Sequence, residues 1–175
     1  MTNWYIFFVV TGQEESIANQ LNFHFQNELF TAFVPLLETL FKKSGRVDKE
    51  IKVMFPGYVF VEAELGEDDF VKYTSQIMSV SKNIIRLLNY GSSKRIALYE
   101  TERKLLIDMF NDSYCIETSH GFIEGDKIYI ESGPLKGLES KITKVDRHKR
   151  EAILTIEMLG ALRDVKVGLD VLRKV

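Results

Sequence analysis

The chain has 175 residues, of which 45% are hydrophobic and 27% are charged, as in a folded protein rather than a disordered one. The formal net charge of −2 excludes a global positive field, so any contact with nucleic acid must come from a local patch. A single cysteine, Cys115, excludes an internal disulfide and a four-cysteine metal site. The longest apolar run is too short to cross a bilayer, and no secretory signal opens the chain. We therefore expect a cytoplasmic protein without membrane contact.

The first residues predict a strand that is followed by a helix. Residues 4–10 are aromatic or β-branched at nearly every position, which is typical of a buried strand. Thr11 and Glu14 have the spacing of a capping box, with Thr11 as the N-cap. Apolar residues then recur at helical intervals as far as Phe25, which indicates an amphipathic helix.

The next segments predict further strands and two more helices. A strand is expected at 31–42 with an interruption at Pro35, and another at 51–64, which Pro56 and Gly57 must bend. The polar segment between them, 44–50, has the character of a mobile loop or hairpin tip. The remaining elements expected here are a helix from residue 67, a strand at 84–88 and a helix at 103–110.

The character of the sequence changes after a polar segment at 111–120, which we interpret as a linker between two domains, 1–110 and 121–175. The tail domain carries more basic than acidic side chains. Short β-like runs separated by turn residues predict a small five-stranded barrel. These runs are 127–131, 139–145, 151–157, 165–167 and 171–175.

No catalytic constellation is recognisable in the sequence. The three histidines lie far apart and have no metal-ligand spacing to one another or to Cys115. A phosphate-binding glycine loop and a nucleophile elbow are also missing. Glu62 and Glu64 share one side of a strand, but a solvated strand end explains them better than acid–base catalysis. We expect no enzyme, no cofactor and no metal.

In the predicted strands of the first domain, both odd-numbered and even-numbered residues are apolar, so both faces of the sheet require burial. The few helices suffice for about one face, which would leave an aromatic patch exposed for another macromolecule. Alternatively, the helices and the segment after Ile84 cover the sheet completely, and the residues by themselves favour neither arrangement. The aromatic candidates for exposure are Tyr5, Phe7, Phe55, Tyr58 and Phe60.

A basic cluster lies on a predicted hairpin turn of the tail domain. It comprises Lys144, Arg147, His148, Lys149 and Arg150, with Lys136 and Lys141 as possible neighbours. Such a cluster can hold phosphates, and the absence of interleaved aromatics favours duplex RNA over single strands. By itself, a solvated hairpin tip is the simpler interpretation. The same choice applies to Lys42, Lys43, Arg46 and Lys49 around the polar segment 44–50, for which we favour solvation.

Two motifs in this order resemble the NusG family of transcription factors along nearly the whole chain. The segment 55–61, FPGYVFV, resembles the most recognisable motif of the family's N-terminal domain, and Trp4-Tyr5 resembles its first strand. The segment from Gly125-Asp126 to Gly133-Pro134 resembles the KOW motif that opens the C-terminal barrel. The resemblance implies an α+β fold: an N-terminal α/β sandwich, with an antiparallel sheet and about three helices, followed by a five-stranded SH3-like barrel.

The resemblance also implies binding partners and a monomeric state. The N-terminal domain would bind the clamp helices of RNA polymerase through a hydrophobic surface, which matching positions assign to Tyr5, Phe7, Phe55, Pro56, Tyr58, Phe60 and Ile84. The barrel of general family members binds a ribosomal protein or the termination factor Rho. Family barrels often carry aromatics on that surface, whereas this chain has Leu135, Leu138 and Leu159.

These leucines and the rich basic turn indicate a specialised paralogue similar to LoaP-type antiterminators, which recognise an RNA hairpin in a leader. Its RNA-binding residues would be those of the basic cluster. The alternative is a general NusG that couples polymerase to the ribosome or Rho through protein contacts. A ribosome-associated KOW protein is a third possibility, which the whole N-terminal domain disfavours. Strands rich in Ile, Val and Thr favour a barrel over the helical tail that the RfaH branch can adopt.

Overall fold

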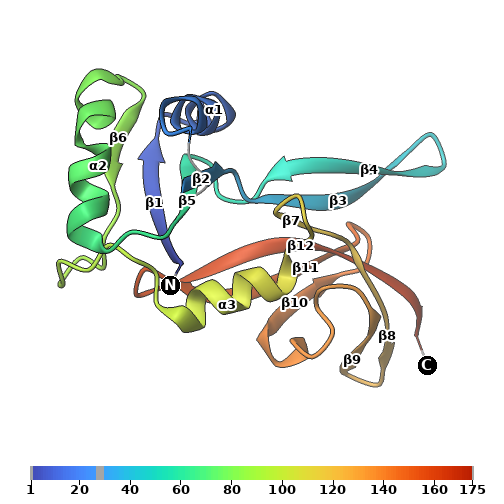
Figure 1. The fold of residues 1–175 in the computed structure, drawn as a ribbon. Coiled ribbons are helices and arrows are strands. Elements are labelled where there is room, and N and C mark those ends of the chain that lie inside the picture. Colours follow the sequence, from blue (N-terminus) through green and yellow to red (C-terminus); the bar gives the residue numbers. More distant parts are fainter. Residues whose placement is uncertain (1, 27–29, 175) are drawn as a thin grey trace. The chain divides into compact units, whose positions relative to one another are not determined.

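The computed structural model describes residues 2–26 and 30–174 (Figure 1). The chain folds into two compact units. The first comprises Met1–Pro35 and Phe55–Arg103, and the second comprises Leu36–Met54 and Lys104–Val175. The α+β class is confirmed. The second unit includes residues 36–54, which the sequence-based division assigned to the first domain; that division, 1–110 and 121–175, stays a prediction.

The first unit contains a four-stranded antiparallel sheet in the order β2-β5-β1-β6. Its strands are β1 (Asn3–Val9), β2 (Phe30–Phe33), β5 (Tyr58–Ala63) and β6 (Ile84–Leu87). The strands predicted at 4–10 and 84–88 are confirmed, as is the interruption at Pro35, because β2 ends at Phe33 and the next strand begins at Leu36. Proline lacks the N–H that a ladder requires, which explains the break.

Two helices, α1 (Glu14–His24) and α2 (Glu67–Val80), supply aromatic and aliphatic side chains to the core of this unit. The ring of Tyr5 stacks on that of Phe70 at 3.7 Å between centroids, and Phe25 contacts Phe30 at 4.5 Å. Three acidic residues precede Phe70 in the first turn of α2, where the helix dipole favours negative charge. The sequence prediction of both helices is therefore confirmed.

The predicted cap of α1 is wrong. Gln13, not Thr11, occupies the N-cap position, and no side chain caps the helix there. Glu14 instead accepts hydrogen bonds from the backbone N–H groups of Gly12 at 2.8 Å and Gly57 at 2.6 Å. The third helix, α3 (Glu100–Met109), begins three residues earlier than predicted. The carboxylate of Glu102 accepts a hydrogen bond from the N–H of Tyr99 at 3.1 Å, which satisfies a free donor at its start.

The second unit contains a hairpin of β3 (Leu36–Lys43) and β4 (Arg46–Val53), to which β7 (Cys115–Ile116) adds in parallel. The hairpin turns at Ser44 and Gly45, which have φ values of 50° and 80°. The prediction of a loop over 44–50 is thus wrong in extent, because the turn comprises two residues and β4 begins at once. The strand β4 was not recognised in the sequence because it has no buried face, so its residues do not show the apolar alternation that indicates a strand.

The second unit also contains a five-stranded sheet in the order β10-β11-β12-β8-β9. The predicted number of strands agrees, but their identities differ. The structure adds β8 at the start and joins the two last predicted runs into β12, and Val175 lies outside the described residues. The strands are β8 (Ser119–Glu124), β9 (Lys127–Ser132), β10 (Ile142–Asp146), β11 (Glu151–Met158) and β12 (Ala161–Lys174); Glu139–Lys141 form a 3-10 turn.

A buried contact joins the two sheets of the second unit. The carboxylate of Glu38 on β3 accepts a hydrogen bond from the N–H of Thr118 at 3.1 Å and pairs with Lys49 at 3.2 Å. Gly168 on β12 lies against them, since a Cβ there would be 2.7 Å from the carbonyl oxygen of Glu38. We call Glu38, Lys49, Thr118 and Gly168 the clasp. Most of the segment 111–120, predicted as a linker, is therefore packed within this unit.

Candidate functional site

The aromatic residues predicted to form one surface are divided between the two faces of the first unit's sheet. In the antiparallel pairing, Phe7 lies opposite Val59 and Phe8 lies opposite Tyr58. Directly opposed residues share a face, so Tyr5 and Phe7 point to one side and Tyr58 and Phe60 to the other. Phe70 of α2 covers the first side. The expectation of exposure is therefore wrong for Tyr5 and Phe7.

The other face carries a cluster of aromatic side chains around the bend between β4 and β5. Tyr58 lies 6.0 Å from Phe8 and 6.1 Å from Phe55, measured between ring centroids. Phe8 and Tyr58 are half-buried and Pro56 is exposed, whereas Phe55 and Phe60 are buried, contrary to expectation. Ile84 is buried on β6 opposite Val9. We call Phe8, Phe55, Pro56 and Tyr58 the aromatic bend.

Sequence reasoning missed Phe8, because strand alternation groups it with Trp4 and Ile6 but does not say which face of β1 contacts Tyr58. Positions 4, 6 and 8 form one face of β1 and positions 5, 7 and 9 form the other. Because both sets are apolar, only the pairing register shows which set faces Tyr58. The sequence does not reveal this register, and Tyr5 and Phe7 lie on the face of β1 opposite to the one that contacts Tyr58.

The aromatic bend is held in one conformation by backbone contacts. Gly57 has φ of +83°, and an added Cβ would lie 3.0 Å from Cε2 of Phe8, so glycine is required there. Its carbonyl accepts a hydrogen bond from the N–H of Val9 at 2.7 Å, and its N–H donates to Glu14. The buried carboxylate of Glu14 was not predicted, since its pattern suggested only a capping role. Pro56 is thereby presented on a fixed turn.

Four residues of the basic cluster, Arg147 to Arg150, lie on the turn between β10 and β11, and Lys144 lies within β10. Lys144, Arg147, His148 and Lys149 are exposed. Asp146 shapes the turn by accepting a hydrogen bond from the N–H of Lys149 at 3.0 Å, and this bond holds the pKa of the Asp146 carboxyl below its ordinary value. The Asp146 carboxylate therefore binds the backbone of its own turn, and the neighbouring cationic side chains are exposed.

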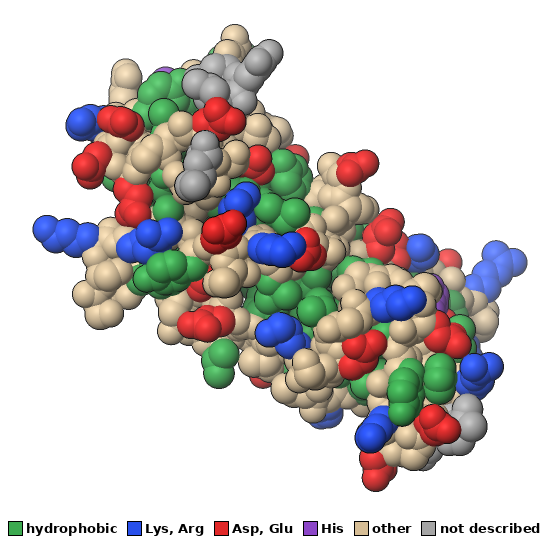
Figure 2. All heavy atoms as spheres, turned by 60° about the horizontal axis from the view of Figure 1, so that its bottom comes forward, with side chains coloured by type: hydrophobic (Ala, Val, Ile, Leu, Met, Phe, Trp, Pro, Cys, Tyr) green, Lys and Arg blue, Asp and Glu red, His purple; other side chains and the backbone are tan. Residues whose placement is uncertain are grey.

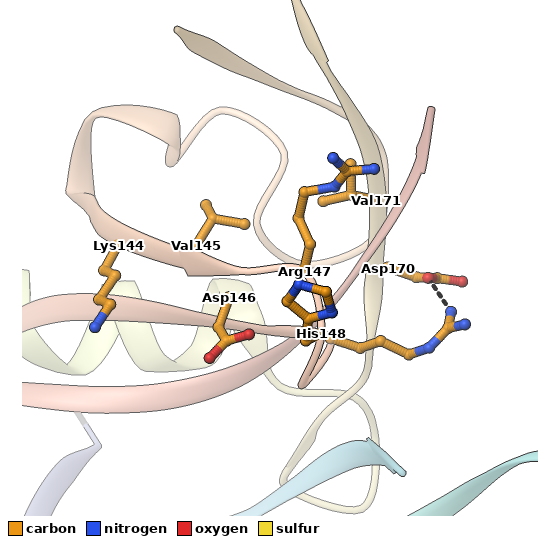
Figure 3. A pocket seen from close by; sticks show the side chains of 8 residues that line it. Lys144, Val145, Asp146, Arg147, His148, Asp170 and Val171 are labelled. Atoms are coloured by element: carbon orange, nitrogen blue, oxygen red, sulfur yellow. Dashed lines mark hydrogen bonds and ion pairs between the residues drawn. The ribbon is translucent and has the colours of Figure 1, made fainter. Parts of the chain in front are cut away.

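Arg150 differs from its neighbours because it is half-buried and forms an ion pair with Asp170 on β12. The turn borders a hollow of about 590 Å³ whose lining includes Lys144, Arg147, His148 and Arg150. In Figure 3, Arg147 extends toward Val171, and the dashed line marks the ion pair of Arg150 with Asp170. The turn therefore combines one structural arginine with exposed cations that remain available to a ligand.

The other predicted residues of the second unit lie elsewhere on its surface or in its core. Lys136 follows the Gly133-Pro134 turn and Lys141 ends the 3-10 turn; both are exposed, and neither lines the hollow at the basic turn. Leu135 is fully buried, with its N–H donating to Oγ of Ser119 at 3.0 Å, so its side chain belongs to the core. Leu138 and Leu159 are half-buried.

The surface shows no field of one charge on the face drawn in Figure 2, where basic and acidic side chains are interspersed. Among residues 2–26 and 30–174, no three His, Cys, Asp or Glu side chains are grouped as a metal site would require. None of the helices in these ranges has the length and apolar character needed to span a membrane. The arrangement offers two candidate surfaces, the aromatic bend and the basic turn.

Comparisons with known proteins agree along the chain. Residues 2–107 match a family model described as transcription termination factor NusG. The chain is 22% identical to the transcription termination/antitermination protein NusG of Thermus thermophilus over 176 residues, covering 95% of this chain and 94% of that protein. The proteins of the same name from Staphylococcus epidermidis and Staphylococcus aureus are 23% and 22% identical, covering 98% of this chain and 94% of each.

Proposed function

Because the chain belongs to the NusG family of transcription termination and antitermination proteins, we propose that it is an antitermination and processivity factor. It binds the clamp helices of RNA polymerase through its first unit and a hairpin in leader RNA through the basic turn of its second unit. The observation that carries the RNA-binding role is the exposure of Arg147, His148 and Lys149 on the β10–β11 turn, with Lys144 exposed on the adjoining strand β10.

Polymerase contact is assigned to the aromatic bend rather than to the full set of residues that the family resemblance implied. Tyr5 and Phe7 pack against Phe70 and are needed for the core. Tyr58 and Pro56 remain accessible, and the ring of Tyr58 packs against those of Phe8 and Phe55. Large aromatic side chains on a rigid support are typical of residues that dominate protein–protein binding energy.

RNA contact at the basic turn is assigned to phosphate recognition. The turn offers flexible ammonium groups and a guanidinium but no Phe, Tyr or Trp ring on which a base could stack. Duplex RNA presents closely spaced phosphates, and neutralising them releases counterions. The affinity should therefore fall steeply as the salt concentration rises.

The proposed mechanism requires no chemical step by the factor. Contact with the clamp favours the elongating state of polymerase over the paused state if the factor binds the first more tightly. Holding a leader hairpin on the second unit raises the local concentration of the first unit at the polymerase, so two modest affinities suffice.

Two variants separate the two proposed surfaces. Arg147→Glu/Lys149→Glu should weaken binding to a leader RNA hairpin by about tenfold or more while polymerase affinity is unchanged, because it reverses two exposed charges. Arg150 is left unchanged, because its replacement would remove the ion-pair partner of Asp170. Tyr58→Ala should weaken polymerase binding by about tenfold and leave RNA affinity unchanged.

The control for Tyr58→Ala is Phe23→Ala, which removes an aromatic ring from an exposed position on α1. Fluorescence anisotropy with labelled RNA and with purified polymerase measures each affinity. An RNA affinity that the double charge reversal leaves unchanged would refute the RNA-binding role. In that case the general NusG role, coupling polymerase to the ribosome or Rho, becomes the better account, and the half-buried Leu138 and Leu159 become its candidate contacts.

A further inference from the structure

A second hollow lies on the other side of the basic turn. Its volume is about 320 Å³, and its walls come from two parts of the second unit that are distant in sequence. The β3–β4 hairpin contributes Lys42 and Lys52, and the β10–β11 turn contributes His148, Lys149 and Arg150. Thus the fold brings two lysines of the first half of the chain beside the basic turn.

The charges around this hollow favour an anionic ligand. Lys52 pairs with Glu50 at 3.1 Å, and Arg150 pairs with Asp170. Within the part of the chain that the structure describes, the ammonium groups of Lys42 and Lys149 form no ion pair with a carboxylate. The lining includes one acidic residue, Glu151. Two lysines without an ion-pair partner within 4 Å among the described residues therefore line the same hollow, one from each of the two segments, and Asp146 and Glu151 are the acidic side chains near Lys149.

The two hollows at the turn are neighbours because both are lined by His148 and Arg150. Cationic side chains consequently continue around the turn from Arg147 to the β3–β4 hairpin. The hairpin is fixed to the five-stranded sheet by the clasp, through the hydrogen bond from Thr118 to Glu38 and the close approach of Gly168 on β12 to the Glu38 carbonyl. This wall of the second hollow is thus part of the folded unit and is already in place before a ligand binds.

We propose that the β3–β4 hairpin is the second wall of the RNA-binding surface, with Lys42 and Lys149 contacting phosphates of a duplex that lies across the hollow. The inference rests on the proposed RNA-binding role and extends it to residues that the sequence alone assigned to a solvated loop. Phosphate contact by lysine positions a duplex without reading its bases. The wall should therefore add affinity for any RNA stem rather than sequence preference.

The test compares two adjacent lysines of the same hairpin. Lys42 lines the hollow and Lys43 does not, so Lys42→Gln removes a charge from the lining and Lys43→Gln removes an equal charge one residue away. The probe is a perfectly paired RNA hairpin, titrated with the full chain at several salt concentrations. Lys42→Gln should raise the Kd about threefold to tenfold and make the slope of log K against log salt shallower by about one.

The control Lys43→Gln should change the Kd by less than about twofold, which bounds the long-range effect of one charge. Equal effects of Lys42→Gln and Lys43→Gln would overturn the second wall, even if Arg147→Glu/Lys149→Glu still abolished binding. A wild-type chain that fails to bind the hairpin would instead overturn the proposed RNA-binding role itself. A DNA duplex of the same sequence, bound as tightly as the RNA, would contradict recognition of the RNA helix.

Discussion

Among single residues, Glu14 links the first helix to the bend that presents Pro56 and Tyr58. One carboxylate oxygen accepts from the N–H of Gly12 and the other from the N–H of Gly57, and the side chain is buried. Replacing this carboxylate is costly chiefly at Gly57, whose N–H is buried and would lose its acceptor, whereas Gly12 is exposed. The conformation of the aromatic bend therefore depends on a residue that does not contact the proposed partner.

We predict that Glu14→Ala lowers the free energy of unfolding by about 1–3 kcal/mol, since the N–H of Gly57 loses its acceptor in the protein interior. The matched control is Glu15→Ala, which removes the same group from an exposed position one residue later. Urea denaturation followed by circular dichroism provides the measurement. Equal stability of the two variants would contradict the anchoring role of Glu14.

At this scale the sequence was informative about residue type but not about direction. Within the segment 55–61, which the sequence assigned to a polymerase surface, Pro56 is exposed and Tyr58 is half-buried. Tyr5 and Phe7 were wrongly grouped with Tyr58, because in a strand that is apolar at nearly every position the sequence does not show which alternate residues lie on which face of the sheet. A single pairing constraint between β1 and β5 would have replaced Tyr5 and Phe7 by Phe8.

Between elements, the clasp determines how the β3–β4 hairpin joins the five-stranded sheet. Burial raises the pKa of the Glu38 carboxyl, but hydrogen bonding from Thr118 and the charge of Lys49 lower it by more. The net pKa lies below its ordinary value of 4.5, so the folded state favours the ionised carboxylate. The clasp should therefore stabilise the second unit above that value and lose this contribution as the pH falls through the lowered pKa.

We predict that Glu38→Gln reduces the pH dependence of stability. The wild-type urea midpoint should fall between about pH 6 and about pH 3 by more than that of the variant, which lacks the titrating group. Glu50→Gln serves as the control, because Glu50 lies on the same hairpin and forms an exposed ion pair with Lys52. If wild type and Glu38→Gln lose stability in parallel on acidification, the clasp does not contribute as described.

The elements themselves were largely predictable, and the misses have physical causes. Gly168 separated the runs 165–167 and 171–175 and suggested a turn, but the glycine instead permits close approach of Thr118 and the carbonyl of Glu38 within β12. β8 was not predicted: its first two residues, Ser119 and His120, fell in the predicted linker, and the rest of the strand lay before the first predicted run of the tail domain. Tertiary contacts that no local pattern encodes thus determined the extent of these strands.

At the scale of the whole molecule, the proposed function needs the aromatic bend and the basic turn to bind the same elongation complex. The aromatic bend belongs to the first unit and the basic turn to the second. The juxtaposition of Lys42 with Lys149 could not be read from the sequence, because more than a hundred positions separate them and only the packing of the second unit brings them together. A factor that joins two weak interactions should fail when either surface is removed.

The most direct test measures transcription past a terminator by purified polymerase on a template that encodes a leader hairpin bound by the wild-type chain. We predict that wild type increases readthrough only when the hairpin is present, and that Tyr58→Ala and Arg147→Glu/Lys149→Glu each abolish the increase while Phe23→Ala does not. Wild-type levels of readthrough with either surface variant, or an increase that is the same on a template without the hairpin, would contradict the account.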